Sequence, residues 1–199
     1  MNPTVKRLSP ILILALLVVV PLAALSRTAR AAQAVVAVAQ RVTEKKVGNS
    51  NWQRAAKGTP LDANNRFRTG KRSSADLKFR DGSLLRLGQL SMVELRGGKN
   101  VSLLGGKLLF SMLKGGRVVA GGAAAAIKGS VGIIEWRDDG SGGFTLYSGA
   151  MDVETPQATV TVAPGTRVNV APDGTISLPQ RVAILPYAGN TLHPELLTP

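Results

Sequence analysis

Beyond residue 34 the apolar residues recur with a period of two, and this spacing restricts the fold more than any other feature of the chain. In Ala75–Arg80 apolar and charged residues alternate, as in a half-buried strand. Asp81–Ser83 then supplies a turn, since glycine accepts the positive φ that a tight hairpin requires. Leu85 and Leu87 resume the alternation. The spacing predicts a β-hairpin here.

The same pattern predicts further short strands joined by glycine-containing turns. Turns that recur every ~8–12 residues are typical of all-β sandwiches, barrels and short rolls. The expected fold is therefore all-β: twisted antiparallel sheets or a short β-roll of many short strands with glycine-rich turns. The predicted strands are Met92–Leu95, Val101–Leu104, Leu108–Leu113, Val131–Trp136, Phe144–Tyr147, Met151–Val153, Thr159–Val162 and Arg167–Val170, with turns at Gly97-Gly98, Gly105-Gly106, Gly115-Gly116 and Asp173-Gly174.

One segment fits more than one structure. Gly121–Ile127 contains four consecutive alanines, which favour a helix by propensity, but it is short and begins with two glycines. A closely packed strand and a loop are equally compatible with it.

The amino terminus has the order of residues found in secretory signals. Lys6 and Arg7 precede an apolar run over 11–25, interrupted by Pro21, and small residues follow it. We expect a signal helix that is cleaved after Ala34. The alternative is an uncleaved anchor, although a membrane span needs about 20 apolar residues. The expected organisation is 1–34 signal peptide or anchor, 35–177 β domain and 178–199 proline-rich tail.

Charge and cysteine usage narrow the classes of function. The formal net charge of the chain is +13. Without residues 1–34, 21 basic residues face 12 acidic ones, which favours anionic partners such as phospholipid head groups or wall polymers. A soluble basic surface is the alternative reading. The chain has no cysteine, which excludes disulfides, thiolate metal sites and cysteine nucleophiles. Aromatic residues make up 4% of the chain, too few for a nucleic-acid stacking platform.

Candidate catalytic groups are scarce. The single histidine, His193, precedes a proline in the tail. Asp138 and Asp139 lie in a glycine-rich turn without the spacing of a calcium loop. Gly105-Gly106-Lys107 lacks the remaining residues of a phosphate loop. The sequence therefore predicts a protein that is not an enzyme and has no cofactor or metal, with a wall-degrading hydrolase as a distant alternative.

A run of motifs resembles the FecR domain. The series consists of Trp52, Gly58, Leu61, Phe67–Gly70, Ser74-Ala75, Leu77, Phe79, Asp81–Ser83, Leu85, Leu87, Ser91, Val93 and Leu95, followed by Leu103, Gly106–Leu108, Lys128–Ser130, Tyr147–Met151 and Val162–Gly165. The resemblance covers about residues 35–175 and implies a twisted β fold with no catalytic residue. Trp52 is expected to be an apolar anchor at one end of the sheet.

The resemblance implies that the best-known FecR-like signalling proteins consist of a cytoplasmic anti-sigma segment, a membrane span, the FecR domain and a further small module. Only a few residues precede the apolar run here, so we expect a stand-alone exported FecR-like protein without the anti-sigma segment. The expected function is a periplasmic or secreted, non-catalytic interaction module that binds an envelope protein or anionic polymer. The alternative is a membrane-anchored sensor related to iron-uptake signalling. Membrane contact is expected only if the N-terminus is uncleaved, and no nucleic-acid partner is expected.

The densest basic cluster is the candidate site for an anionic partner. It consists of Arg66, Arg68, Lys71 and Arg72. If the segment is a strand, Arg66 and Arg68 lie on the same face. The other reading of the cluster is a charged strand edge that discourages aggregation.

Overall fold

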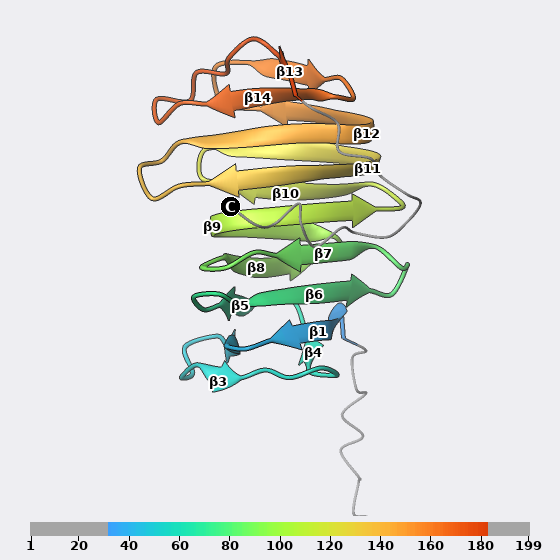
Figure 1. Ribbon diagram of the computed structural model, residues 1–199, viewed down its shortest axis with the longest axis vertical. Helices are drawn as coiled ribbons and strands as arrows, with labels where there is room; N and C mark the ends of the chain where they lie inside the picture. Colours follow the sequence, from blue (N-terminus) through green and yellow to red (C-terminus); the bar gives the residue numbers. More distant parts are fainter. Residues whose placement is uncertain (1–31, 183–199) are drawn as a thin grey trace, which may run out of the picture. The chain divides into compact units, whose positions relative to one another are not determined.

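The computed structural model describes residues 32–182, which form a stack of β-strand layers (Figure 1). The predicted signal helix and most of the proline-rich tail, including His193, lie outside the described residues. Within this range the structure contains strands and no helix, which confirms the all-β prediction. The strands are β1 Ala34–Gln40, β2 Thr43–Val47, β3 Gln53–Arg54, β4 Pro60–Leu61, β5 Asn65–Thr69, β6 Ser74–Phe79, β7 Leu84–Leu87, β8 Met92–Gly97, β9 Asn100–Met112, β10 Gly116–Ala120, β11 Ala123–Trp136, β12 Gly142–Glu154, β13 Thr159–Val162, β14 Thr166–Val170 and β15 Gln180–Arg181.

The strands form one sheet that is folded into two faces. The β6 face runs through β4, β1, β6, β7, the second half of β9, the second half of β11, the first half of β12, β14 and β15. The β8 face runs through β3, β2, β5, β8, the first half of β9, β10, the first half of β11, the second half of β12 and β13. The strand pairs are antiparallel except β9 with β10, which is parallel. This arrangement is the short β-roll of the prediction.

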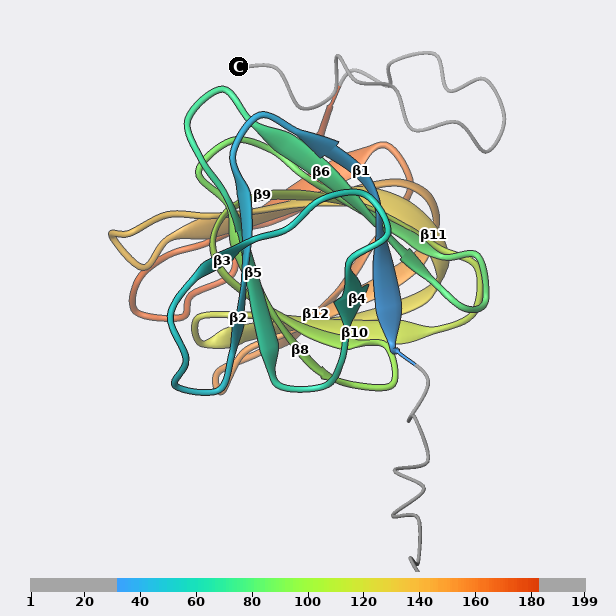
Figure 2. The same ribbon diagram turned by 90° about the horizontal axis from the view of Figure 1, so that it is seen from below.

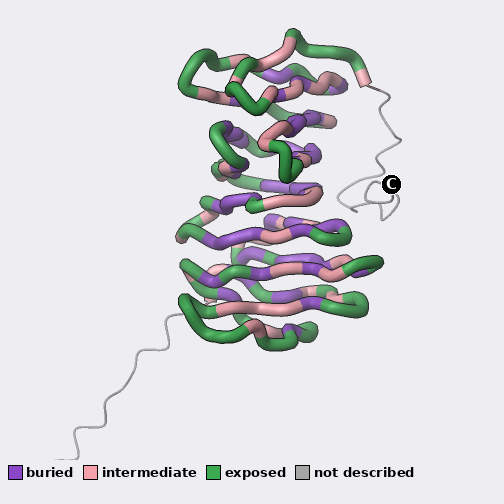
Figure 3. Tube along the Cα trace, turned by 90° about the vertical axis from the view of Figure 1, so that its left-hand side faces the viewer, coloured by how far each residue is buried: buried purple, intermediate pink, exposed green. Residues whose placement is uncertain are grey.

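The core lies between the two faces. Alternate residues point inward along most strands, and Phe67, Phe110 and Phe144, from three different layers, are fully buried. The tube coloured by burial shows the same alternation along most strands (Figure 3). Burying such a row of large side chains stabilises the stack through the hydrophobic effect, and it requires that neighbouring layers keep their register.

The predicted hairpin over residues 75–87 is confirmed as β6 and β7, with Ala75 opposite Leu87. The prediction was wrong at two glycine pairs. Gly105-Gly106 does not end a strand, because β9 is continuous and bends there from the β8 face to the β6 face. Gly115-Gly116 does not close a hairpin either, since the chain crosses over and β10 pairs in parallel with the start of β9.

Two further segments merge in the same way. The alanine-rich segment is a strand, and together with the predicted strand Val131–Trp136 it forms β11. The predicted strands Phe144–Tyr147 and Met151–Val153 are parts of β12, which bends near Gly149. At this bend φ of Gly149 is 88°, and a Cβ atom would meet the Gly129 carbonyl oxygen and Ser130 Cα. Glycine is therefore required where the strand changes face.

The two ends of the roll differ. At the N-terminal end, residues 48–64 cross beneath β1 and β2 and carry the short strands β3 and β4 (Figure 2). Ala55 and Leu61 from this segment are buried in the core. At the C-terminal end the last layer is formed by β13 and β14, and β13 pairs with β12 alone among the described strands.

Candidate functional site

Arg66 and Arg68 lie on the outer side of β5, as the predicted strand requires. Each is bound to a carboxylate on a neighbouring strand. Arg66 Nε donates to Glu94 Oε2 on β8 at 3.1 Å, and Arg68 Nε donates to Glu44 Oε2 on β2 at 2.7 Å. Both arginines are therefore ion-paired on the same face, although Arg66 shares Glu94 with Arg96, whose Nη1 lies 3.1 Å from Glu94 Oε1.

Trp52 is held outside the core. The guanidinium carbon of Arg68 lies 4.1 Å from the centroid of the Trp52 ring, in cation–π contact. Trp52 is only partly buried and is not among the core residues, although it does lie at one end of the sheet. It fixes the loop before β3 to the β8 face through Arg68. The Arg68 guanidinium thus contacts both the Glu44 carboxylate and the Trp52 ring.

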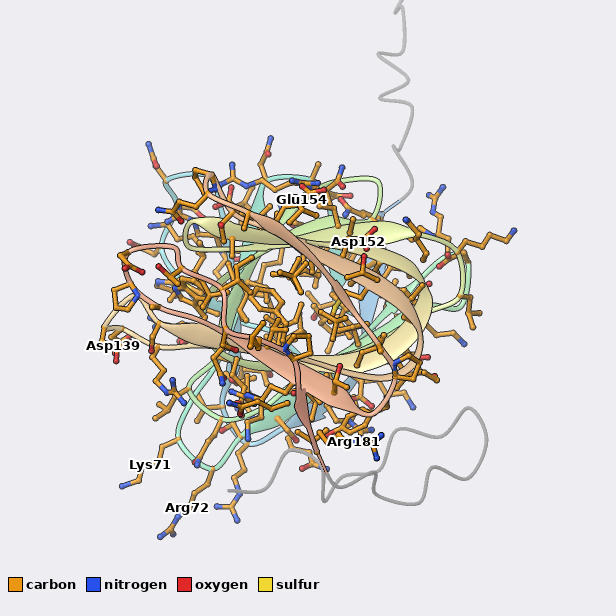
Figure 4. The ribbon with its side chains drawn as sticks, turned by 90° about the horizontal axis from the view of Figure 1, so that it is seen from above. Lys71, Arg72, Asp139, Asp152, Glu154 and Arg181 are labelled. Carbon is orange, nitrogen blue, oxygen red and sulfur yellow. The ribbon has the colours of Figure 1, made fainter. Side chains whose placement is uncertain are left out.

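Lys71 and Arg72 are exposed in the turn between β5 and β6. Both side chains point away from the domain, on the side where Asp139 also lies (Figure 4). The Arg72 backbone N–H donates to Gln89 Oε1 at 3.0 Å, which fixes the turn without using the guanidinium. The structure thus divides the predicted cluster into two ion-paired arginines on a face and two exposed cations at a corner.

The other sequence candidates have structural roles in the described part of the chain. Asp139 accepts hydrogen bonds from the backbone N–H and the hydroxyl of Ser141, at 2.8 and 2.7 Å, and these bonds lower its pKa. Lys107 Nζ lies 2.9 Å from Glu135 Oε1 and lies on a strand, not in a phosphate loop. Residues 32–182 contain no group of three or more His, Cys, Asp or Glu residues placed to hold a metal ion.

A three-charge network on the β6 face was not predicted from the sequence. Glu135 on β11 binds Lys107 on β9 and Arg167 on β14, whose Nη1 lies 2.7 Å from Glu135 Oε2. All three side chains are more than two-thirds buried. They are distant in sequence. Glu135 and Arg167 lie in predicted strands, but Lys107 falls between two predicted strands, directly after the predicted turn at Gly105-Gly106, so the sequence did not indicate that the three meet.

The network alters the titration of Glu135 and of its neighbour Tyr147. Burial alone would raise the pKa of Glu135, but the hydrogen bonds from Lys107 and Arg167 outweigh it and the pKa is lowered. Burial raises the pKa of Tyr147, and the Glu135 carboxylate raises it further. Glu135 is thus an anion at neutral pH and the tyrosine is neutral, so the network keeps a net positive charge.

Two hollows lie next to this network and share Arg137. One has a volume of about 270 Å³ and is lined by Gly88, Gln89, Gly106, Lys107, Glu135, Trp136 and Arg137. The other has a volume of about 350 Å³ and is lined by Arg137, Ser141, Gly142, Asn169, Val170, Ala171, Pro172, Thr175 and Ser177. Arg137 Nη1 donates to Ser141 Oγ at 3.1 Å, which holds the guanidinium between the two hollows.

The free edge of β13 is the second unpredicted feature. The strand Thr159–Val162 contains neither a charge nor a proline, and Thr159 and Thr161 are exposed. Thr161 Oγ1 donates to Asp152 Oδ1 at 2.7 Å, which ties the strand to β12. Edge strands are usually blunted by lysine, proline or extreme shortness. β13 has none of these within its four residues, so its backbone can pair with another strand.

Comparison with known protein families shows to which family the chain belongs. The sequence model of the family described as FecR protein matches residues 65–179, which is more than half of the 199 residues. The chain belongs to the FecR family. The FecR match begins at β5 and ends just before β15, so it includes the three-charge network and the β13 edge.

The fold recurs in solved structures of a candidate anti-sigma factor from Parabacteroides distasonis. Crystal structures of that protein at 1.65 and 2.50 Å each match this FecR protein with a TM-score of 0.54 and 14% sequence identity. Each match covers 60% of this chain and 60% of the other, so the similarity concerns the β fold. A search of curated proteins gives no match. Among residues 32–182 there is no helix of the length and apolarity needed to cross a bilayer.

Proposed function

We propose that this FecR protein is an exported, non-catalytic regulatory module that binds a protein partner by adding a strand of that partner to β13. The observation that carries the proposal is the unpaired edge of β13 at the C-terminal end of the roll. An extended peptide that joins an exposed sheet edge gains backbone hydrogen bonds, and alternate side chains supply specificity.

The surroundings of this edge support a protein partner over an anionic polymer. The cations near it are paired: Lys128 Nζ lies 2.9 Å from Asp152 Oδ2, and Arg117 Nη2 lies 2.8 Å from Glu154 Oε2. A paired surface offers little net charge to a polyanion, whereas backbone pairing and threonine side chains suit a peptide strand. The candidate patch at Arg66, Arg68, Lys71 and Arg72 is consequently a weaker choice for this partner.

The edge can be tested directly in the source organism. The variant Thr159→Lys/Thr161→Lys places two lysines on the edge strand, and lysine on an edge discourages strand pairing. The matched control, Val119→Lys/Ala126→Lys, places two lysines on the same face, on β10 and β11, whose edges are already paired. A photo-crosslinking residue at position 163, which is exposed and directly follows β13, reports partner contact in each background.

We expect a specific adduct in the unmodified chain and in the control, and loss of that adduct in the edge variant. Melting temperatures of the purified variants show whether folding is retained. An adduct of equal yield in the edge variant would contradict strand addition at β13. Fractionation of the organism tests export, and full-length precursor found in the cytoplasm would contradict it.

The family match favours a second candidate, a membrane-anchored regulator related to FecR signalling proteins. In this candidate the N-terminal apolar segment is retained. The mass of the mature protein separates the two, because a chain that begins at Val35 has lost the anchor and one that begins at Met1 has kept it.

A further inference from the structure

The charge of the roll is concentrated at one end. Residues 32–80 contain 11 basic and 3 acidic residues, a net charge of +8, whereas residues 81–182 contain 10 basic and 8 acidic residues, a net charge of +2. These first 49 residues form the lowest layers, β1 to β6 (Figure 1). The excess charge therefore belongs to the N-terminal end and not to the molecule as a whole.

Nine of these 11 cations have no acidic partner among residues 32–182, since only Arg66 and Arg68 are ion-paired. Five of the nine lie within residues 41–57, and one of these, Lys45, donates from Nζ to the Pro60 carbonyl oxygen at 2.6 Å. The other four are Arg41, Lys46, Arg54 and Lys57, which lie in the β1–β2 turn, on β2, on β3 and in the loop that follows β3. Arg41, Arg54 and Lys57 are exposed and Lys46 is partly exposed. We call these four residues together with Val42 and Val47 the basic end.

Exposed apolar side chains accompany these cations. Val42 is 54% exposed and Val47 is 51% exposed, one at each end of β2. Val35 and Val38 on β1 are 39% and 40% exposed. Four of the eight large apolar side chains that are exposed in the described residues thus lie on the first two strands or the turn between them. Cations mixed with exposed apolar side chains are typical of surfaces that sit on an anionic bilayer.

We propose that the basic end docks on the surface of an anionic lipid bilayer. The cations meet the phosphate head groups, and Val42 and Val47 reach the boundary between head groups and acyl chains. The valines favour a bilayer over a soluble polyanion, since a soluble polyanion gives them no apolar environment. The proposal goes beyond partner binding at β13 and holds whether or not residues 1–34 are retained. It leaves the opposite end of the roll free for a protein.

The test uses the purified full chain and sedimentation with two kinds of vesicle, phosphatidylcholine alone and phosphatidylcholine mixed with phosphatidylglycerol. A retained apolar N-terminus raises binding to both kinds, so the measured quantity is the ratio of anionic to neutral binding. The variant Lys46→Gln/Arg54→Gln/Lys57→Gln removes three cations of the basic end. The control, Lys114→Gln/Arg137→Gln/Arg181→Gln, removes three exposed cations elsewhere and has the same net charge.

Each surface Lys or Arg contributes roughly fivefold to binding at an anionic membrane. We expect the ratio to fall on the order of 100-fold in the basic-end variant and much less in the control. High salt abolishes the preference of the unmodified chain. Equal losses in the two variants would mean that net charge alone attracts the protein, and a ratio near one in the unmodified chain would overturn the proposal.

A further variant distinguishes a bilayer from a soluble polyanion. Val42→Ser/Val47→Ser keeps every charge, so it should weaken vesicle binding while binding to dextran sulfate stays unchanged. If vesicle binding also stays unchanged, the basic end is a site for a soluble polyanion and the bilayer proposal is wrong.

Because the chain has no cysteine, a fluorophore can be placed at a single position. A probe at Asn51→Cys in the N-terminal end should be quenched by a lipid-borne quencher in the unmodified background and not in the basic-end variant. A probe at Asp173→Cys, near the far end, should remain unquenched in both. This readout requires no protein partner, so its failure would leave strand addition at β13 unaffected.

Discussion

The two ends of the roll solve the problem of the exposed sheet edge differently. The N-terminal end is closed: residues 48–64 cross it, the strands β3 and β4 have two residues each, and one of them contains Pro60. The C-terminal end keeps the four-residue edge of β13 without charge or proline. Closing an edge prevents pairing with other chains, and leaving one open permits it. The contrast indicates that the open edge is the end of the stack at which another chain can be added.

The two ends of the roll also differ in whether their cations are paired with acids. Near the N-terminal end most cations lack an acidic partner, whereas near the C-terminal end Lys128 and Arg117 are held by Asp152 and Glu154. A surface of unpaired cations attracts many anions, and a paired one leaves shape and backbone hydrogen bonds to select a partner. One end is thus suited to a broad charged surface and the other to a specific strand.

The largest expected effect on stability comes from opening the closed end. Leu61→Ala removes a fully buried side chain from the segment that crosses the N-terminal end. We expect a loss of about 2–5 kcal/mol in the free energy of unfolding, because the cavity is added to the lost burial. The control is Leu178→Ala near the other end, where leucine is 85% exposed, and its effect should stay within about 0.5 kcal/mol. Urea unfolding measures both, and similar losses would contradict this account.

An intermediate effect is expected at the corners of the roll. All four non-glycine residues with positive φ in the described residues lie in the first half, between Arg41 and Leu90, whereas the bend of β12 uses Gly149. Gly149→Ala should cost about 1–3 kcal/mol, since it combines backbone strain with a clash against residues 129 and 130. Leu90→Gly should not lower the free energy of unfolding and should raise it by up to about 1 kcal/mol. The reason is that glycine adopts the left-handed backbone conformation at this position without the strain that leucine carries there. Thermal unfolding of both variants checks the opposite signs.

The smallest effect is expected from the three-charge network, and it depends on pH. Because the folded-state pKa of Glu135 is lowered, its contribution is present at neutral pH and is lost as the pH falls through that value. Glu135→Gln should cost about 1–2 kcal/mol at neutral pH, with the difference from the unmodified chain shrinking below a pH of about 4. Lys57→Gln at the basic end has no acidic partner to lose and should show no such dependence. Urea unfolding at a series of pH values would refute this account if the cost of Glu135→Gln were constant.

Most of the strands could be predicted from the sequence, because the alternation of apolar and polar residues along a strand is a local property. The hairpin β6–β7 and the strand β13 match their predicted ranges to within one residue, since each has clear alternation and a turn at its end. Gly105-Gly106 misled the prediction because a glycine that bends a continuous strand and one that reverses a chain have the same local sequence. The difference lies in the partners of the following residues, which belong to other layers.

Less of the candidate site could be predicted from the sequence, because its contacts also join residues of different layers. Arg66 and Arg68 share a face, as the spacing indicated, but the acids that pair with them stand 28 and 24 residues away. Glu135 joins β9 and β14, and the separation from Arg167 is 32 residues. Such contacts are set by the stacking order of the layers. A list of basic residues therefore predicted the charge of the surface and not which cations are free.

The stacking of layers also determines how the domain would bear tension. A load applied between its two ends acts across the backbone hydrogen bonds of successive layers. The boundary between β5–β6 and β7–β8 has the fewest paired residues of any between full layers, three on the β8 face and four on the β6 face. It is also crossed by the ion pairs Arg66–Glu94 and Asp76–Arg86. Pulling should therefore separate the basic layers from the rest at this boundary first, at a force that falls when acid or salt weakens the two bridges.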